Sequence, residues 1–246
     1  MSSPDRLPET VICIPGPWAT RNDLIMTVGK YSGGYLYAGV AMMHMESRAS
    51  FTVQFEERNP RMAAAFAAVG KDWLDEKTLA QIDAHRSCVY LIANGGSEEA
   101  AKNIMQAAAA LLKCGGIAVK IESSGVAHSA AKWTDMAANP HRMNLYWAYV
   151  VFVGNINDGY YSCGMHNIGY PDCVMDAGID SQSAAKTIDA FLKYMLLEEP
   201  VLHSGENFRT EEDAPSYEIS REECRRFPPG DLYYNPYGVW KLTPAI

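Results

Sequence analysis

The sequence lacks the patterns that mark a membrane-bound or exported chain. No run of about 18 apolar residues is present, so no transmembrane helix is expected. Residues 1–5 lack a basic start followed by an apolar stretch, so no signal peptide is expected either. Cysteines occur without a framework spacing, which in a chain with no export signal predicts reduced thiols. They are Cys13, Cys88, Cys114, Cys163, Cys173 and Cys224. These absences predict a cytoplasmic protein.

An excess of positive charge is also missing. The 246 residues hold 21 Lys and Arg against 29 Asp and Glu, a formal net charge of −8 at pH 7. Nucleic acids and anionic membranes both require a basic face, so neither is expected as a partner. The content of 48% hydrophobic and 20% charged residues is that of an ordinary globular chain, which excludes a disordered one.

Fingerprints of cofactor binding are absent. The sequence has no Gly-x-Gly-x-x-Gly, no Walker pattern, no His-Glu-x-x-His and no Cys-x-x-Cys. Residues 94–97, Asn-Gly-Gly-Ser, join an expected strand to an expected helix, a place where phosphates can bind. However, Glu98 and Glu99 already occupy the positive end of that helix and would repel an anion. No cofactor is therefore expected.

What is present predicts an α+β fold. Two helices are well marked, Ser97 to Lys113 and Ser181 to Leu196, the first by a Ser cap, acidic residues in its first turn and a following glycine. Leu145 to Val153 and Tyr160 to Cys163 look like strands of a hairpin, joined at Asn-Asp-Gly over 157–159. Because hairpins interrupt the alternation of strands and helices, α+β is favoured over a doubly wound parallel sheet.

The order of the expected elements gives a more detailed prediction. The pattern β-α-β-β-α-β fits residues 10–93, and a similar order can be drawn over 117–220. We therefore expect two packed ferredoxin-like halves with antiparallel or mixed sheets and a C-terminal strap. The whole chain, 1–246, would be one compact domain, with a subdivision into 9–95 and 96–246.

Chemically versatile residues are densest in YSCGMHNIGYPDC, residues 161–173. Cys163 and His166 have metal-ligand spacing, yet a closed zinc site needs four ligands and no second pair exists. In an extended strand these two side chains would point to opposite faces, although Gly164 could kink the chain and bring them together. A strand leaving through a Gly-rich turn is the favoured interpretation, and no metal is expected.

The same residues allow a catalytic alternative. Cys163 could act as a nucleophile with His166 as its base and Asp172 as the group that orients the histidine. His128 or Trp133 could complete such a site. The alternative needs a surrounding that stabilises a thiolate.

Aromatic residues gather near the C-terminus. Tyr233, Tyr234, Tyr237 and Trp240 are candidates for a platform that binds a partner protein or a sugar. The competing interpretation is a strap that packs over the body of the protein.

Residues 164–242 resemble a known family. The similarity rests on the turn Gly164 to Asp172, the helix Ser181 to Leu196, the segment Val201 to Phe208, and Asn235 to Leu242. These segments resemble the bacterial domain of unknown function family 4261. The resemblance implies no reaction and no catalytic residues. Glycines and Pro-Asp recur in the family's turn and cysteines do not, which favours a structural role for this segment.

Two functions from different classes remain open. The leading hypothesis is a non-catalytic protein that binds another protein, in an accessory or immunity-type role; homodimerisation is a second expectation. An exposed apolar patch would support it. The rival is a metal- or thiol-dependent small-molecule enzyme with its site near Cys163, His166 and Asp172, which requires a cleft where these side chains converge.

Overall fold

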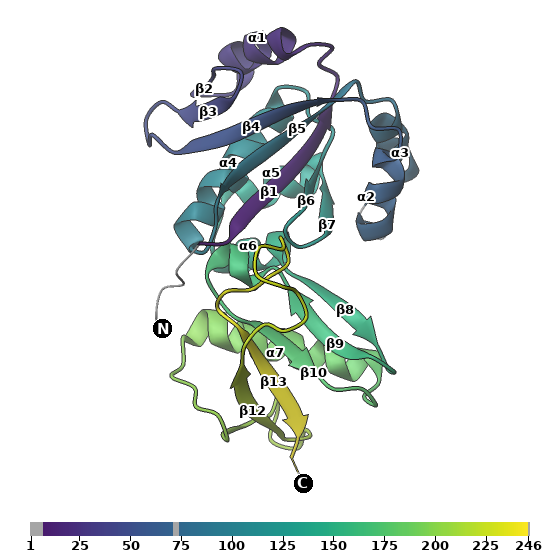
Figure 1. The fold of residues 1–246 in the computed structure, drawn as a ribbon, viewed down its shortest axis with the longest axis vertical. Helices are drawn as coiled ribbons and strands as arrows, with labels where there is room; N and C mark the ends of the chain where they lie inside the picture. The colour runs from purple at the N-terminus through teal and green to yellow at the C-terminus, as the bar shows by residue number, and fades with distance from the viewer. Residues whose placement is uncertain (1–6, 71–73, 246) are drawn as a thin grey trace.

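Two β-sheets, stacked one above the other in Figure 1, organise the protein. The computed structural model describes residues 7–70 and 74–245. In the first sheet the strand order is β2-β3-β4-β5-β1-β6-β7, and every neighbouring pair is antiparallel. Its strands are β1 (Glu9–Gly16), β2 (Tyr35–Tyr37), β3 (Ala41–His44), β4 (Ser50–Glu57), β5 (Ser87–Asn94), β6 (Ala118–Ile121) and β7 (Val126–Ser129).

Helices cover both faces of the first sheet. On one face lie α1 (Arg21–Tyr31), α4 (Glu98–Lys113) and α5 (Ala130–Ala138), whose apolar side chains join the main core. On the other face lie α2 (Met62–Gly70) and α3 (Glu76–Asp83), which enclose a smaller cluster. The prediction for α4 is confirmed: Ser97 Oγ accepts a hydrogen bond from the Ala100 amide at 3.1 Å and so caps its start.

The second sheet has the order β11-β12-β13-β10-β9-β8. Only β10 and β13 run parallel among the described strand pairs of this sheet. Helix α7 (Ser181–Glu198) packs on one face through β8, β9 and β10. The strands are β8 (Val151–Asn155), β9 (Gly159–Cys163), β10 (Asp172–Met175), β11 (Asn207–Phe208), β12 (Tyr217–Glu222) and β13 (Val239–Pro244).

Helix α6 (Arg142–Tyr149) and the short 3₁₀ helix η1 (Met165–Ile168) lie where the two sheets meet (Figure 1). The predicted strand Leu145 to Val153 is wrong in its first half, because residues 145–149 are helical. His141 caps α6, and Leu145 and Tyr149, four residues apart, bury the same helix face. The hairpin that follows, β8 to β9, is confirmed.

The division of the chain also differs from the expected one. Strands β6 and β7 belong to the first sheet, so residues 117–220 do not form a separate β-α-β-β-α-β unit. A boundary at 95/96 would separate β6 and β7 from their own sheet, which ends at Ser129. One core cluster reaches from Ile12 in β1 to Leu242 in β13, so the two sheets share buried apolar side chains.

The expected strap is an internal loop. Residues 223–238 connect β12 to β13 and rise toward α6 in Figure 1, while the described chain ends in strand β13 and Ala245. None of the helices that the structure describes is long and apolar enough to cross a bilayer.

Candidate functional site

The segment 161–173 is a turn that locks the two sheets together. Gly164 has φ of 118°, and a Cβ at this position would clash with the carbonyl oxygen of Tyr149 in α6. Gly169 has φ of 91°, and its Cβ would meet the carbonyl oxygen of Gly96 at 2.6 Å. Only glycine therefore lets the turn approach these backbones.

Asp172 also holds this turn in place between the two sheets. Its carboxylate is buried and accepts hydrogen bonds from Ser162 Oγ at 2.8 Å, from the Met165 amide at 3.3 Å and from Asn235 Nδ2 at 2.6 Å. These donors come from β9, η1 and the loop 223–238. A buried carboxylate with three donors is a structural hub, because each bond offsets part of its desolvation.

His166 does not form a catalytic pair with Cys163. The ring is fully buried, and its Nδ1 lies 3.8 Å from Asp172 Oδ2, beyond hydrogen-bond distance. Neither ring nitrogen has a hydrogen-bond partner among the described residues. Within residues 7–70 and 74–245, no group of three or more His, Cys, Asp or Glu is placed to hold a metal ion.

The thiols near the turn are not activated. Burial raises the pKa of the Cys163 thiol far above its usual range, and the charge of Asp172 adds to this effect. Burial likewise raises the pKa of Cys173. Both thiols are protonated at neutral pH, whereas a nucleophilic cysteine needs a lowered pKa.

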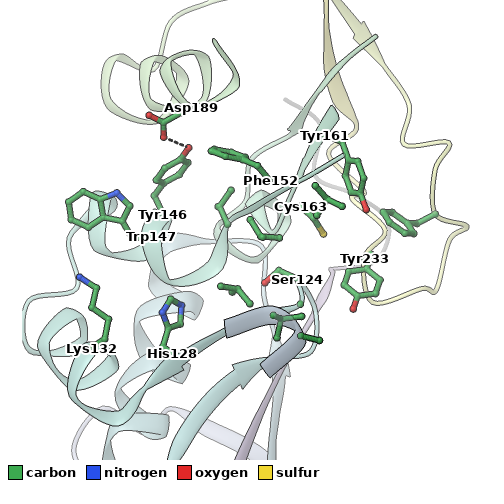
Figure 2. A pocket seen from close by; sticks show the side chains of 18 residues that line it. Ser124, His128, Lys132, Tyr146, Trp147, Phe152, Tyr161, Cys163, Asp189 and Tyr233 are labelled. Atoms are coloured by element: carbon green, nitrogen blue, oxygen red, sulfur yellow. Dashed lines mark hydrogen bonds between the residues drawn. The ribbon is translucent and has the colours of Figure 1, made fainter. Parts of the chain in front are cut away.

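An apolar groove opens beside this turn, between the two sheets (Figure 2). Its volume is about 1100 Å³. Trp147 of α6 and Phe152 of β8 form one side, and Tyr161 of β9 and Tyr233 of the loop 223–238 form the other. A large apolar cleft where two layers meet is the usual location of a binding site.

A neutral histidine lies in the wall of the groove. His128 Nε2 is 2.9 Å from the carbonyl oxygen of Ala148, which can only accept, so Nε2 carries the proton and Nδ1 is a free acceptor. Burial lowers the pKa of His128 to about 4. Trp133 packs against this ring at 5.7 Å and is fully buried; it does not line the groove.

The two charged side chains that line the groove, Asp189 and Lys132, differ in whether an opposite charge lies beside them. Asp189 of α7 accepts a hydrogen bond from the Tyr146 hydroxyl at 2.9 Å (Figure 2). It accepts a second one from Lys193 Nζ at 2.6 Å, so its charge is neutralised. Lys132 of α5 lies over the Trp147 ring, with Nζ 5.9 Å from its centroid. No carboxylate of the described chain lies within 4.0 Å of that ammonium.

Strand β8 borders the groove and is the last strand of its sheet. Its outer edge pairs with no strand of the described chain, leaving alternate backbone N–H and C=O groups without strand partners. The side chains of Phe152 and Val153 are 36% and 41% exposed, and Trp147 nearby is 47% exposed. Exposed apolar side chains therefore coincide with an unpaired strand edge.

The four C-terminal aromatic candidates do not form one platform. Tyr233 lines the groove, and Tyr234 is half-buried in the same loop. Tyr237 donates a hydrogen bond from its hydroxyl to the Gly96 carbonyl at 3.1 Å. Trp240 is 7% exposed in β13 and packs edge-on against Phe191.

The fold and the groove define an α+β protein with a cleft at the junction of two sheets. Comparisons with protein-family models, with curated proteins and with solved structures found no match.

Sequence reasoning missed most of the groove. Trp147 and Phe152 fall in the segment 145–153 that was expected to be one strand. The one signal for the groove in this segment is the apolar run Val151, Phe152 and Val153, which precedes the Asn-Asp-Gly turn. Three apolar residues in a row are unusual for a strand at the edge of a sheet.

Proposed function

We propose that this protein is non-catalytic and binds another protein. An extended segment of the partner adds to the free edge of β8 and inserts apolar side chains into the groove. The observation that carries this proposal is the continuity of the apolar groove with an unpaired strand edge. Strand addition of this kind takes affinity from main-chain hydrogen bonds and specificity from side-chain pockets.

A peptide explains both features better than a small molecule does. An apolar metabolite would use the groove but has no use for a row of backbone donors and acceptors. Phe152 and Val153, both exposed on β8, favour the same occupant, because an apolar strand edge left uncovered promotes unwanted association.

The chemistry of the groove supports a binding role over a catalytic one. The Cys163 thiol is protonated because burial raises its pKa, and His128 is held neutral with Nε2 on a carbonyl. Asp189 is neutralised by its neighbours. The groove thus contains no activated nucleophile and no available carboxylate base among its described lining residues.

Further parts of the proposal concern fold and setting. Strands β4, β5, β1 and β6, with α1 and α4 packed on one face, have the strand order and helix placement of a ferredoxin-like unit, which supports that interpretation for the first sheet. All six cysteines are free, in keeping with a cytoplasmic location. A relation to family 4261 and an accessory or immunity-type role remain part of this proposal.

Selection from a random peptide library displayed on phage tests the binding site. The protein is immobilised as wild type, as Val153→Lys and as Val201→Lys. Val153 is on the β8 edge, whereas Val201 is 82% exposed and does not line the groove. Lysine at a strand edge blocks pairing. We expect peptides that bind wild type and Val201→Lys but bind Val153→Lys at least tenfold more weakly.

Two results would contradict the proposal. If no peptide is enriched on the wild type, the groove does not bind extended segments and the proposal is wrong. If the wild type is a dimer in analytical ultracentrifugation and Val153→Lys is a monomer, the segment that binds at β8 comes from a second copy of this chain and not from a different protein.

A further inference from the structure

We propose that the groove selects a partner segment with an acidic side chain, which Lys132 binds at the mouth of the groove. This inference rests on the proposed function and names the chemistry of the segment.

Lys132 is the only Lys or Arg among the described lining residues, and His128 beside it is neutral. Its ammonium lies over the face of Trp147 and has no carboxylate within 4.0 Å in the described chain. A cation on an aromatic face keeps its outward side free for an anion. In a protein of net charge −8, a cation left without a carboxylate beside an apolar groove is a distinctive local feature.

The carboxylate in the groove does not cancel this charge. Asp189 is already bound by Lys193 at 2.6 Å and by the Tyr146 hydroxyl at 2.9 Å. An incoming carboxylate therefore meets one free positive charge at Lys132 and a negative charge that is already compensated.

The far side of the groove carries a second cation. The Arg226 guanidinium lies 4.1 Å from the centroid of the Tyr161 ring, which lines the groove. Arg226 likewise has no carboxylate within 4.0 Å in the described chain. Asp231 of the same loop accepts a hydrogen bond from the Tyr233 amide at 2.8 Å. This side of the groove therefore carries charges of both signs, and Lys132 is the cation on which the inference rests.

An unsatisfied hydroxyl deep in the groove also points to a ligand. Ser124 is 3% exposed, and its Oγ has no hydrogen-bond partner in the described part of the chain. Figure 2 shows Ser124 between His128 and Cys163 in the groove wall. A buried hydroxyl without a partner costs free energy, and a segment that moved the side chains covering this oxygen and reached it with a carbonyl would remove that cost.

The decisive experiment repeats the phage selection on charge-reversed protein. The same random peptide library is selected on wild type, on Lys132→Glu and on Lys186→Glu. Lys186 is an exposed lysine of α7 outside the groove lining, so its reversal controls for net charge. We expect Asp or Glu at a recurring position on wild type and on Lys186→Glu, replaced by Lys or Arg on Lys132→Glu.

The outcomes separate this inference from the proposed function. If no peptide is enriched on any of the three proteins, the binding function itself fails. If peptides are enriched with the same motif on all three, the groove binds segments but Lys132 does not select their charge, and only this inference is overturned.

A pair of dyes gives a second, partner-independent readout. N-phenyl-1-naphthylamine is neutral, and 8-anilino-1-naphthalenesulfonate has the same aromatic body with a negative charge. For Lys132→Gln we expect the anion to bind about fivefold more weakly and the neutral dye to change less than twofold, as suits an exposed charge pair. Equal effects on both dyes would contradict charge selection, and no binding of either dye to wild type would contradict an accessible apolar groove.

Discussion

The charged groups of the turn 161–173 and of the groove beside it are paired in opposite ways, although the His166 ring in the turn also has no hydrogen-bond partner in the described chain. In the turn, Asp172 bonds to three donors and the glycines fit against neighbouring backbones. In the groove, Ser124 Oγ has no hydrogen-bond partner and the Lys132 ammonium has no carboxylate within 4.0 Å in the described chain. Residues that satisfy one another hold a fold together, whereas groups left unsatisfied at a cleft are available to a ligand.

The largest effect should come from the hub of the turn. Asp172→Ala leaves the Met165 amide and Asn235 buried without their acceptor, so we expect the free energy of unfolding to fall by about 4 kcal/mol. Urea denaturation followed by circular dichroism measures it. The control is Asp213→Ala, an exposed carboxylate, for which a change under about 0.5 kcal/mol is expected. A loss below about 1 kcal/mol for Asp172→Ala would contradict its role as a hub.

Backbone contact in the turn gives the next effect. Gly164→Ala places a methyl group against the Tyr149 carbonyl and strains a positive φ, so a loss of about 3 kcal/mol is expected. Gly178→Ala is a matched control, because Gly178 has a similar φ of 92° but open space around it. It isolates the cost of φ alone, about 1 kcal/mol. Equal losses for the two variants would show that the close approach contributes nothing.

Acid should weaken the wall of the groove through His128. Its folded pKa of about 4 lies below its usual 6.5, so the unfolded chain binds the proton more readily. Stability contributed by the neutral ring is complete above pH 6.5 and is lost as the pH falls toward 4. The difference in unfolding free energy between wild type and His128→Gln should shift by about 2–3 kcal/mol across this window. Parallel pH profiles for the two proteins would contradict the shift.

The smallest effect on stability is expected on the rim of the groove. Phe152→Ser removes a side chain that is 36% exposed, so the unfolding free energy should fall by only about 1–2 kcal/mol. The same variant should lose binding of the neutral dye. A variant that is strongly destabilised would assign Phe152 to the core instead of the binding surface.

The sequence predicted those elements whose signals are local. Helices α4 and α7 have capping residues and regular apolar spacing, and both are found where they were expected. The Asn-Asp-Gly turn predicted the β8–β9 hairpin correctly. In contrast, α6 contains Tyr146, Trp147 and Tyr149, and aromatic residues favour a strand by propensity. The segment is nevertheless helical, because a helix buries Leu145 and Tyr149 in the shared core.

The groove could not be predicted in the same way. Its walls come from α5, α6, β8, β9 and a loop more than 60 residues further along the chain, which meet only in the folded protein. The segment 161–173 is rich in Cys, His and Asp and so suggested a catalytic or metal site, yet most of its residues hold the two sheets together. Tyr161 and Cys163 are the members that also line the groove, and there Cys163 is a protonated thiol.

Amide hydrogen exchange on β8 tests the central claim most directly. Exchange at Val151–Asn155 is measured by NMR in the free protein and with a peptide selected on the wild type. Strand addition predicts that alternate amides of β8, open in the free protein, become protected by at least tenfold when the peptide binds. A peptide that binds without slowing exchange anywhere on β8 would contradict the account.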